Sequence, residues 1–169
     1  MAGNDSPLEA LGLDRLRIGQ GFDVHPFSDD PTRTLVLGGV TFDGAKGLVG
    51  HSDADVVAHA CTDALLGATG LGDIGMFFPD TDPNLAGADS IAMLATATAR
   101  LREKGWVPLN VDCTVVLDAP KLAPYRSRME QLLSEAVGAA VTIKGKRTEG
   151  MPGLLGGIHC FASALVVGL

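Results

Sequence analysis

The residues that most directly suggest chemistry are Asp23 and His25, which stand two positions apart in the stretch GFDVHPF. Alternate side chains of an extended chain point to the same side, so this spacing brings a carboxylate and an imidazole to one point. A third candidate, His59, lies in a segment whose apolar spacing predicts a helix. Two imidazoles and one carboxylate with an open fourth position are the ligand set of a catalytic zinc site. The spacing alone leaves open a second interpretation, a helix-surface histidine beside an ordinary turn.

The stretch HSDAD, residues 51–55, predicts the start of that helix, with the hydroxyl of Ser52 as the N-cap and acids in the first turn. Whatever the cap, a helix start presents free N–H groups and the positive end of the helix dipole, which favour an anion. Asp55, His59 and Asp63 follow at a spacing of four, so they share one face of the helix. A candidate anion site therefore precedes a candidate metal ligand on the same helix.

Charge excludes one large class of function. The net charge is −7 and the pI is about 4.9, whereas a nucleic-acid binder needs a basic face to neutralise phosphates. The one basic cluster, KGKR at residues 144–147, is too short to hold a duplex but can meet a small anion. Glu149 follows it as a lone carboxylate, which alone indicates no more than a surface ion pair.

Length and composition predict one domain over residues 17–169, after a loose tail over residues 1–16 that lacks the features of a signal or transit peptide. No apolar run approaches the roughly 20 residues of a membrane span. Three scattered cysteines without a C-x-x-C pair indicate reduced, buried thiols. We therefore expect a cytoplasmic protein that binds neither membrane nor nucleic acid.

The elements that must position these residues follow from hydrophobic periodicity and from glycine and proline punctuation. A long loop is expected over residues 72–88, and loops of this length are often functional. Mixed strands and helices predict an α+β fold, a single mixed β-sheet covered by helices on one face. Strands are expected over 17–22, 34–42, 111–117, 141–144 and 158–167, and helices from about 52 to 67, 89 to 104 and 125 to 137.

Three stretches between residues 17 and 124 stand out together: RIGQGFDVHPF, GHSDADVVAHACTDALLGATGLGDIGMFFPDTDPNLAGADS and NVDCTVVLDAPKLAP. With them the chain resembles a known family, that of 2-C-methyl-D-erythritol 2,4-cyclodiphosphate synthase of the non-mevalonate isoprenoid pathway. The resemblance implies a homotrimer with active sites shared between subunits. It also implies a cyclising, CMP-releasing phosphorus–oxygen lyase that acts on 4-diphosphocytidyl-2-C-methyl-D-erythritol 2-phosphate.

The resemblance also implies roles for residues. Asp23, His25 and His59 match the zinc ligands, and Glu149 matches the acid that binds a second ion, Mg²⁺ or Mn²⁺. His51 and Ser52 match the pair that meets the phosphate and helps to stabilise the transition state. The remaining substrate contacts implied are Asp73, Ile74, Gly75, Phe78, Pro79, Asp80, Thr81 and Asp82 for the methylerythritol part, Ala119, Pro120, Lys121 and Leu122 for the cytidine, and Lys146 in the basic cluster.

The C-terminal fifth departs from the family pattern. Arg147 stands where the family has a threonine that stabilises the transition state, so either Thr148 or Arg147 itself, as a cationic clamp, takes that role. The run over 152–157 is about two residues shorter than in the family and lacks its arginine, which there faces a central cavity able to hold an isoprenoid diphosphate.

Two other functions stay open from the sequence. The same three ligands would serve a zinc-dependent phosphate-ester hydrolase, with Asp63 or Asp73 as the general base. A catalytically impaired trimeric binding protein of the same fold is the other alternative, and the substitution at Arg147 and the short 152–157 run motivate it.

Overall fold

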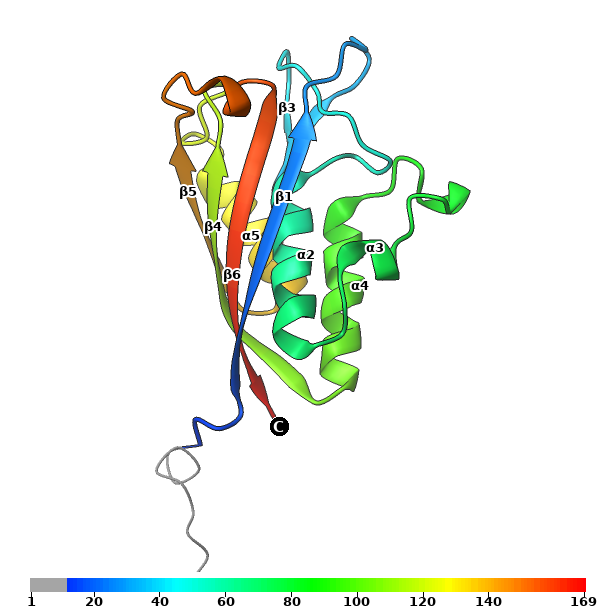
Figure 1. Ribbon diagram of the computed structural model, residues 1–169, viewed down its shortest axis with the longest axis vertical. Helices are drawn as coiled ribbons and strands as arrows, with labels where there is room; N and C mark the ends of the chain where they lie inside the picture. The colour runs from blue at the N-terminus through cyan, green and yellow to red at the C-terminus, as the bar shows by residue number, and fades with distance from the viewer. Residues whose placement is uncertain (1–11) are drawn as a thin grey trace, which may run out of the picture.

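The computed structural model describes residues 12–169 and shows one central sheet with helices against one of its faces (Figure 1). Its four strands are ordered β1-β6-β4-β5; β1 and β4 each pair antiparallel with β6, and β4 pairs parallel with β5. The predicted mixed sheet with helices on one face is confirmed. The strands are β1 (Leu16–Pro26), β4 (Trp106–Val116), β5 (Ala140–Lys146) and β6 (Gly157–Gly168).

Three long helices cover the sheet: α2 (Val56–Thr69), α4 (Ser90–Glu103) and α5 (Arg126–Val137). The helix α2 lies against β1 and β6, α4 packs on α2, and α5 packs on β5. The core between the layers is built from small and aliphatic side chains, with three free, buried cysteines among them. No helix among the described residues is long and apolar enough to cross a membrane.

Close packing of α2 on β1 depends on two glycines of the strand. A Cβ on Gly21 would lie 2.0 Å from the carbonyl oxygen of Ala60, and one on Gly19 would lie 2.0 Å from that of Ala64. Only glycine permits an approach this close. Because Asp23 and His25 follow at the same strand spacing, the glycines bring α2 against the part of β1 that carries these two residues.

Four expectations need correction. Residues 34–42 form not one strand but a separate two-stranded hairpin, β2 (Leu35–Leu37) and β3 (Val40–Phe42), because Gly38 and Gly39 both adopt positive φ and turn the chain. The sheet is therefore accompanied by a second, small one. The N-cap of α2 is Asp55 and not Ser52, because Asp55 Oδ1 accepts from the backbone N–H groups of residues 57 and 58. The first turn of α2 contains no acidic residue.

The loop over 72–88 contains short helical turns, α3 (Ile74–Phe77) and η1 (Pro83–Leu85), each started by an aspartate cap. A further 3-10 turn, η2 (Pro152–Leu154), precedes β6. The N-terminal tail expected over 1–16 lies, for residues 1–11, outside the described residues.

Near β1, none of the residues from 12 to 169 covers the face of the sheet away from the helices, and this part of the face is apolar. Ile18 is 78% exposed, Phe22 48%, Val24 43% and Phe161 43%. Strand register places Phe22 directly opposite Phe161, with ring centroids 4.7 Å apart. We call Ile18, Phe22, Val24 and Phe161 the open sheet face. A contiguous apolar patch of this kind is typical of an interface.

Candidate metal centre and substrate pocket

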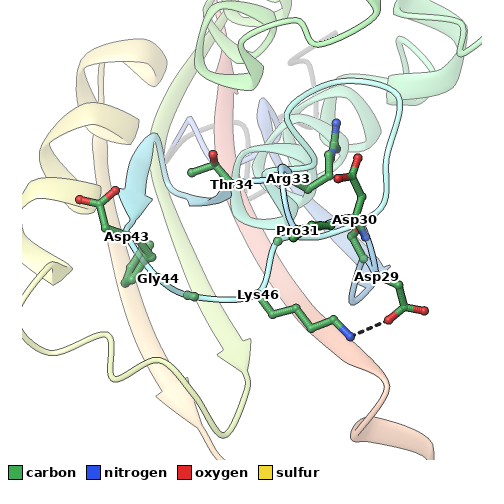
Figure 2. Close-up of a pocket in the computed structure, with 12 residues that line it drawn as sticks. Asp29, Asp30, Pro31, Arg33, Thr34, Asp43, Gly44 and Lys46 are labelled. Atoms are coloured by element: carbon green, nitrogen blue, oxygen red, sulfur yellow. Dashed lines mark hydrogen bonds and ion pairs between the residues drawn. The ribbon is translucent and has the colours of Figure 1, made fainter.

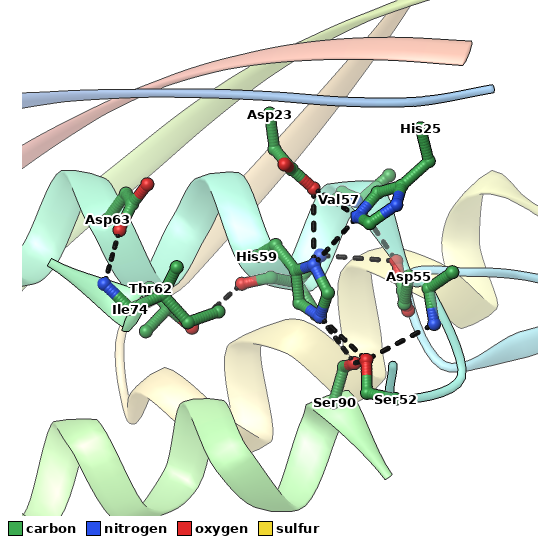
Figure 3. Close-up of polar contacts among 12 residues, drawn as sticks. Asp23, His25, Ser52, Asp55, Val57, His59, Thr62, Asp63, Ile74 and Ser90 are labelled. Carbon is green, nitrogen blue, oxygen red and sulfur yellow. Dashed lines mark hydrogen bonds and ion pairs between the residues drawn. The ribbon is translucent and has the colours of Figure 1, made fainter. Parts of the chain in front are cut away.

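Asp23, His25 and His59 converge at one point, between the end of β1 and the helix α2 (Figure 3). Asp23 Oδ2 lies 3.0 Å from His25 Nε2 and 3.1 Å from His59 Nδ1, and the two imidazole nitrogens are 3.1 Å apart. One ligand atom from each residue lies within 4.8 Å of the others, and among the described residues this is the one such group. Two neutral nitrogens and one carboxylate oxygen are a donor set that fits a divalent cation such as Zn²⁺.

The electrostatics of the cluster favour an ionised carboxylate. Burial raises the pKa of Asp23, but hydrogen bonds from His25 and His59 and their positive charge outweigh it and hold that pKa well below its usual range. Burial alone would lower the pKa of His25, whereas the Asp23 carboxylate raises it above the ordinary value. Without a metal, protons take the place of the cation between these groups.

The ring of His25 is fixed from its other side. Its Nδ1–H donates to the backbone carbonyl of Val49 at 2.6 Å, which turns Nε2 toward Asp23 and His59. Arg33 immobilises the loop that supplies this carbonyl, because its guanidinium donates to the carbonyl oxygens of residues 48, 50 and 52 at 3.0, 3.1 and 3.1 Å. This role of Arg33 was not predicted, because in the sequence Arg33 is a single basic residue directly before an expected strand.

The ring of His59 is fixed as well. Its Nε2 lies 2.8 Å from Ser90 Oγ and 3.1 Å from Ser52 Oγ, and both hydroxyls are buried (Figure 3). Ser90 is the first residue of α4, and nothing in its sequence context distinguished it from an ordinary helix start.

A pocket of about 370 Å³ opens beside the three candidate ligands. It lies between the segment that precedes α2 and the 72–88 loop. The pocket brings together most of the predicted residues on this side of the molecule: Asp23, His25, His51, Ser52, His59, Ile74, Gly75, Phe78, Pro79 and Asp80, with Leu85 and Met93 in addition.

Some predicted loop residues instead stabilise the loop itself. Asp73 caps α3 by accepting from Met76 N at 2.9 Å, and Asp82 caps η1. His51 is exposed, and its Nε2 donates to the Asp82 carbonyl at 2.8 Å. Thr81 is exposed and does not line the pocket.

The Asp63 carboxylate also stabilises the fold through a hydrogen bond. Its carboxylate accepts from Ile74 N at 2.7 Å, which ties α2 to the start of α3. Burial raises the pKa of Asp63, partly offset by that N–H. Neither Asp63 nor Asp73, the two candidate bases of a hydrolase, lines the pocket beside the metal cluster.

A second hollow, of about 420 Å³, lies at the other edge of the sheet and shares no residue with the first. It contains several of the residues implied for the nucleotide and the basic cluster. Its lining is Leu117, Asp118, Pro120, Lys121, Leu122, Ala123, Arg126, Gly145, Lys146 and Arg147. Ala119, joined to Pro120 by a cis peptide bond, lines a neighbouring hollow with Phe27.

Asp118 links this hollow to the turn that follows β5. It accepts from the Thr148 hydroxyl at 2.5 Å and from the Thr148 backbone N–H at 3.2 Å, and its pKa is lowered chiefly by that hydroxyl. The Arg147 Nε lies 3.6 Å from Asp118, and the Arg147 side chain is 77% exposed. Glu149 is exposed with a positive φ of 52°, a conformation that a non-glycine residue rarely adopts. Asp118 was not found by sequence reasoning.

Another hollow is larger than the metal pocket and the hollow at the β5 edge, but its lining offers no comparable reactive or ligating groups. It measures about 490 Å³ and lies between the 28–34 and 42–47 segments (Figure 2). Asp29 pairs with Lys46 across it at 2.8 Å, and both are well exposed. Exposed pairs of this kind contribute little and indicate no site.

Comparison with known proteins adds independent findings. The model of the YgbB family matches residues 16–167. A relative from Azoarcus sp. (strain BH72), named 2-C-methyl-D-erythritol 2,4-cyclodiphosphate synthase, is 53% identical over 136 residues, 79% of this chain and 83% of its own. A solved structure of 2C-methyl-D-erythritol-2,4-cyclodiphosphate synthase in a bound form with CDP is similar with a TM-score of 0.80 and 36% identity, over 89% of this chain and 99% of its own. The bifunctional IspDF from Campylobacter jejuni gives a TM-score of 0.85 at 36% identity, over 91% of this chain but only 42% of that longer chain.

Proposed function

Because the chain belongs to the YgbB family, we propose that it forms 2-C-methyl-D-erythritol 2,4-cyclodiphosphate from 4-diphosphocytidyl-2-C-methyl-D-erythritol 2-phosphate and releases CMP. One observation in the structure carries the proposal. Asp23, His25 and His59 converge in the lining of a pocket that is also lined by His51 and Ser52.

The reaction joins two groups of one molecule, since the 2-phosphate attacks the β-phosphorus and CMP leaves. The protein therefore has to fold the substrate and offset negative charge more than it has to supply reactive groups. Asp23, His25 and His59 would hold Zn²⁺, which offsets charge on phosphoryl oxygens when it is bound.

The chain's own residues supply the rest of the phosphate site. His51 and Ser52 line the pocket beside the cluster. The Ser52 hydroxyl can donate to a phosphate oxygen, and the His51 imidazole can do so once its Nε2–H leaves the Asp82 carbonyl. The 74–80 segment closes the same pocket with Ile74, Phe78 and Pro79, an apolar surface suited to the methylerythritol carbon chain. Asp63 keeps this segment in place through Ile74 N.

Roles at the second hollow follow from its contacts. Pro120, Lys121 and Leu122 surround a space beside the basic residues Lys146 and Arg147, and we assign the cytidine to it. Glu149 is exposed to solvent, which leaves its carboxylate accessible to the second divalent ion, Mg²⁺ or Mn²⁺. Since the Thr148 hydroxyl is donated to Asp118, we assign the charge-stabilising role to the exposed Arg147 and a positioning role to Thr148.

The two hollows suggest how subunits combine. The metal cluster is on the β1 edge and the nucleotide hollow on the β5 edge, with two strands between them. Three strand spacings amount to about 14 Å across the sheet, and the substrate must touch both sites at once. We propose that the open sheet face packs in a homotrimer and that a neighbour's β5 edge completes each metal pocket.

The alternatives fit less well. A hydrolase needs a general base beside the open metal position, and the carboxylates of Asp63 and Asp73 are occupied by backbone N–H groups outside the pocket. A binding protein without turnover is motivated by the departure at Arg147 and by the short 152–157 run, and both leave the metal cluster intact.

The test is incubation of the purified protein with the cytidyl substrate, Zn²⁺ and Mg²⁺, followed by phosphorus NMR. We expect equal amounts of CMP and cyclic diphosphate, and none from His59→Ala. A linear product would indicate the hydrolase. No product from a zinc-loaded protein would indicate the binding protein, and either result would contradict the proposal.

A further inference from the structure

The side of the His59 ring that faces away from the metal cluster contacts Ser90 (Figure 3), and Ser90 is hydrogen-bonded to the half-buried Asp53. His59 Nε2 lies 2.8 Å from Ser90 Oγ, and Ser90 is fully buried. Ser90 in turn contacts Asp53 twice. Its hydroxyl donates to Asp53 Oδ1, and its backbone N–H donates to Asp53 Oδ2 at 3.1 Å.

The proton positions in this chain follow from what each group can donate. An ionised carboxylate can only accept, so the single hydroxyl proton of Ser90 goes to Asp53. The Ser90 oxygen then has only lone pairs to offer His59, which must donate its Nε2–H. A neutral imidazole has one N–H, so the lone pair of His59 is on Nδ1, the nitrogen that faces Asp23 and His25.

This proton arrangement has two consequences. The Nδ1 lone pair of His59 and the Asp23 oxygen approach to 3.1 Å, which is favourable only with a cation or a proton between them. Ser52 is not required as the partner of His59, so its hydroxyl proton can be donated into the pocket that Ser52 lines. In His25 the lone pair also faces the cluster, but there a single backbone carbonyl, which accepts Nδ1–H, leaves it on Nε2.

We propose that Asp53 and Ser90 are positioning residues that select the tautomer and ring orientation in which His59 binds the metal. The proposal rests on the metal site of the proposed function. It deepens that site because Asp53 and Ser90 touch neither metal nor substrate and act through His59. Partners of this kind typically change metal affinity by about 10–100-fold when they are removed.

The test compares the same chemical change at two nearby carboxylates. Asp53→Asn interrupts the chain to His59, because the amide can donate to Ser90 and reverse the hydrogen bond. Asp89→Asn removes the same charge one residue from Ser90, from an exposed aspartate that only caps α4 by accepting from Ile91 N at 2.8 Å. Ser90→Ala removes the hydroxyl.

Zinc affinity is measured by chelator competition on the full chain. We expect Ser90→Ala and Asp53→Asn to bind Zn²⁺ about 10–100-fold more weakly than the wild type, and Asp89→Asn to stay within about threefold. Thermal unfolding of the metal-free proteins shows whether any variant has lost its fold. Nitrogen-15 NMR of zinc-loaded wild type should show the proton of His59 on Nε2, with that proton exchanging faster in Ser90→Ala.

Each result decides a different point. If the wild type fails to bind Zn²⁺, both the metal site and the positioning roles of Asp53 and Ser90 are overturned. If the wild type binds Zn²⁺ but Ser90→Ala and Asp53→Asn bind it no more weakly than Asp89→Asn, the positioning roles are overturned and the proposed function stands. A His59 proton on Nδ1 in the zinc-loaded protein overturns the positioning roles as well.

Discussion

The two edges of the central sheet differ in how firmly their functional residues are held. At the β1 edge, each ring of the cluster has a hydrogen-bond partner behind it, Val49 for His25 and Ser90 for His59. At the β5 edge, Arg147 and Glu149 extend into solvent. The three candidate metal ligands are held in place by contacts within one chain, whereas the residues assigned to the nucleotide and the second ion at the β5 edge are largely exposed.

Gly21→Ala should disrupt the β1 edge, which we call the firm edge, more than any other change. The new Cβ would lie 2.0 Å from the Ala60 carbonyl, so α2 must move away from β1 and carry His59 with it. We expect a loss of several kcal/mol in the free energy of unfolding, beyond the usual ~1–3 kcal/mol of an overpacked core, together with loss of zinc binding. Denaturant titration measures the first effect. Gly153→Ala is the control, because nothing lies within 4 Å of its Cβ, and equal stability of the two variants would contradict the role of Gly21.

His59→Ala and Glu149→Gln should separate the two edges. We expect His59→Ala to abolish zinc retention and turnover, because one of three ligands is gone. Glu149→Gln should keep full zinc content but weaken the magnesium-dependent rate about 10-fold or more. Metal analysis and CMP release measure both. Full zinc in His59→Ala, or unchanged magnesium dependence in Glu149→Gln, would count against the respective assignment.

Arg147→Thr tests the exposed edge. Losing the cation should lower kcat/KM about 10-fold, a typical cost of one charge-assisted contact, while zinc affinity stays unchanged. Steady-state kinetics decide the matter. A large gain in rate would instead mean that Arg147 impairs the natural protein and would favour the non-catalytic alternative.

Lowering the pH should stabilise the metal-free protein and destabilise the zinc-loaded protein, because protons and Zn²⁺ compete for His25 at the firm edge. The folded pKa of His25 is raised, so the stability that its protonated form gives to the metal-free protein is fully present below pH about 6.5 and is lost as the pH rises through the folded pKa. Zinc competes with that proton and binds better as the pH rises. Melting temperatures with chelator and with Zn²⁺ should therefore respond to pH with opposite signs, and parallel responses would contradict this coupling.

Ala54→Gly should give the smallest effect. Ala54 holds a positive φ of 60° just before the cap of α2, which costs about 1–2 kcal/mol for a residue with a Cβ. We expect a gain of about 1 kcal/mol in stability and no change in zinc affinity, measured by denaturant titration. A loss of stability would show that the Ala54 methyl packs usefully against its surroundings.

Much of the firm edge could be predicted because its signals are local. The D-x-H spacing in an extended segment and the position of His59 in a periodic helix name the three candidates but leave a surface histidine and a turn open, and the family resemblance then favours the metal ligands. The glycines of β1 were present in the same motif, but their meaning depends on Ala60 and Ala64, some 40 residues later. That packing cannot be read from either segment alone.

The contacts that the sequence did not reveal are those between distant loops. Ser90 stands at an expected helix start, Asp118 lies within a stretch that matches the family without a role of its own, and Arg33 carried no signal. Each has its role only because the fold brings a second loop to it. The wrong cap at Ser52 has the same origin, since Asp55 is preferred as the cap because the β2–β3 hairpin donates two further N–H groups to it.

The central claim is that Asp23, His25 and His59 bind one divalent cation. X-ray absorption at the zinc edge of the zinc-loaded protein tests it most directly. We predict one zinc per chain, with only nitrogen and oxygen ligands at about 2.0–2.2 Å and the scattering pattern of two imidazoles. Sulfur ligands at about 2.3 Å, which would move the zinc to the buried cysteines, or a protein that retains no zinc, would contradict the claim.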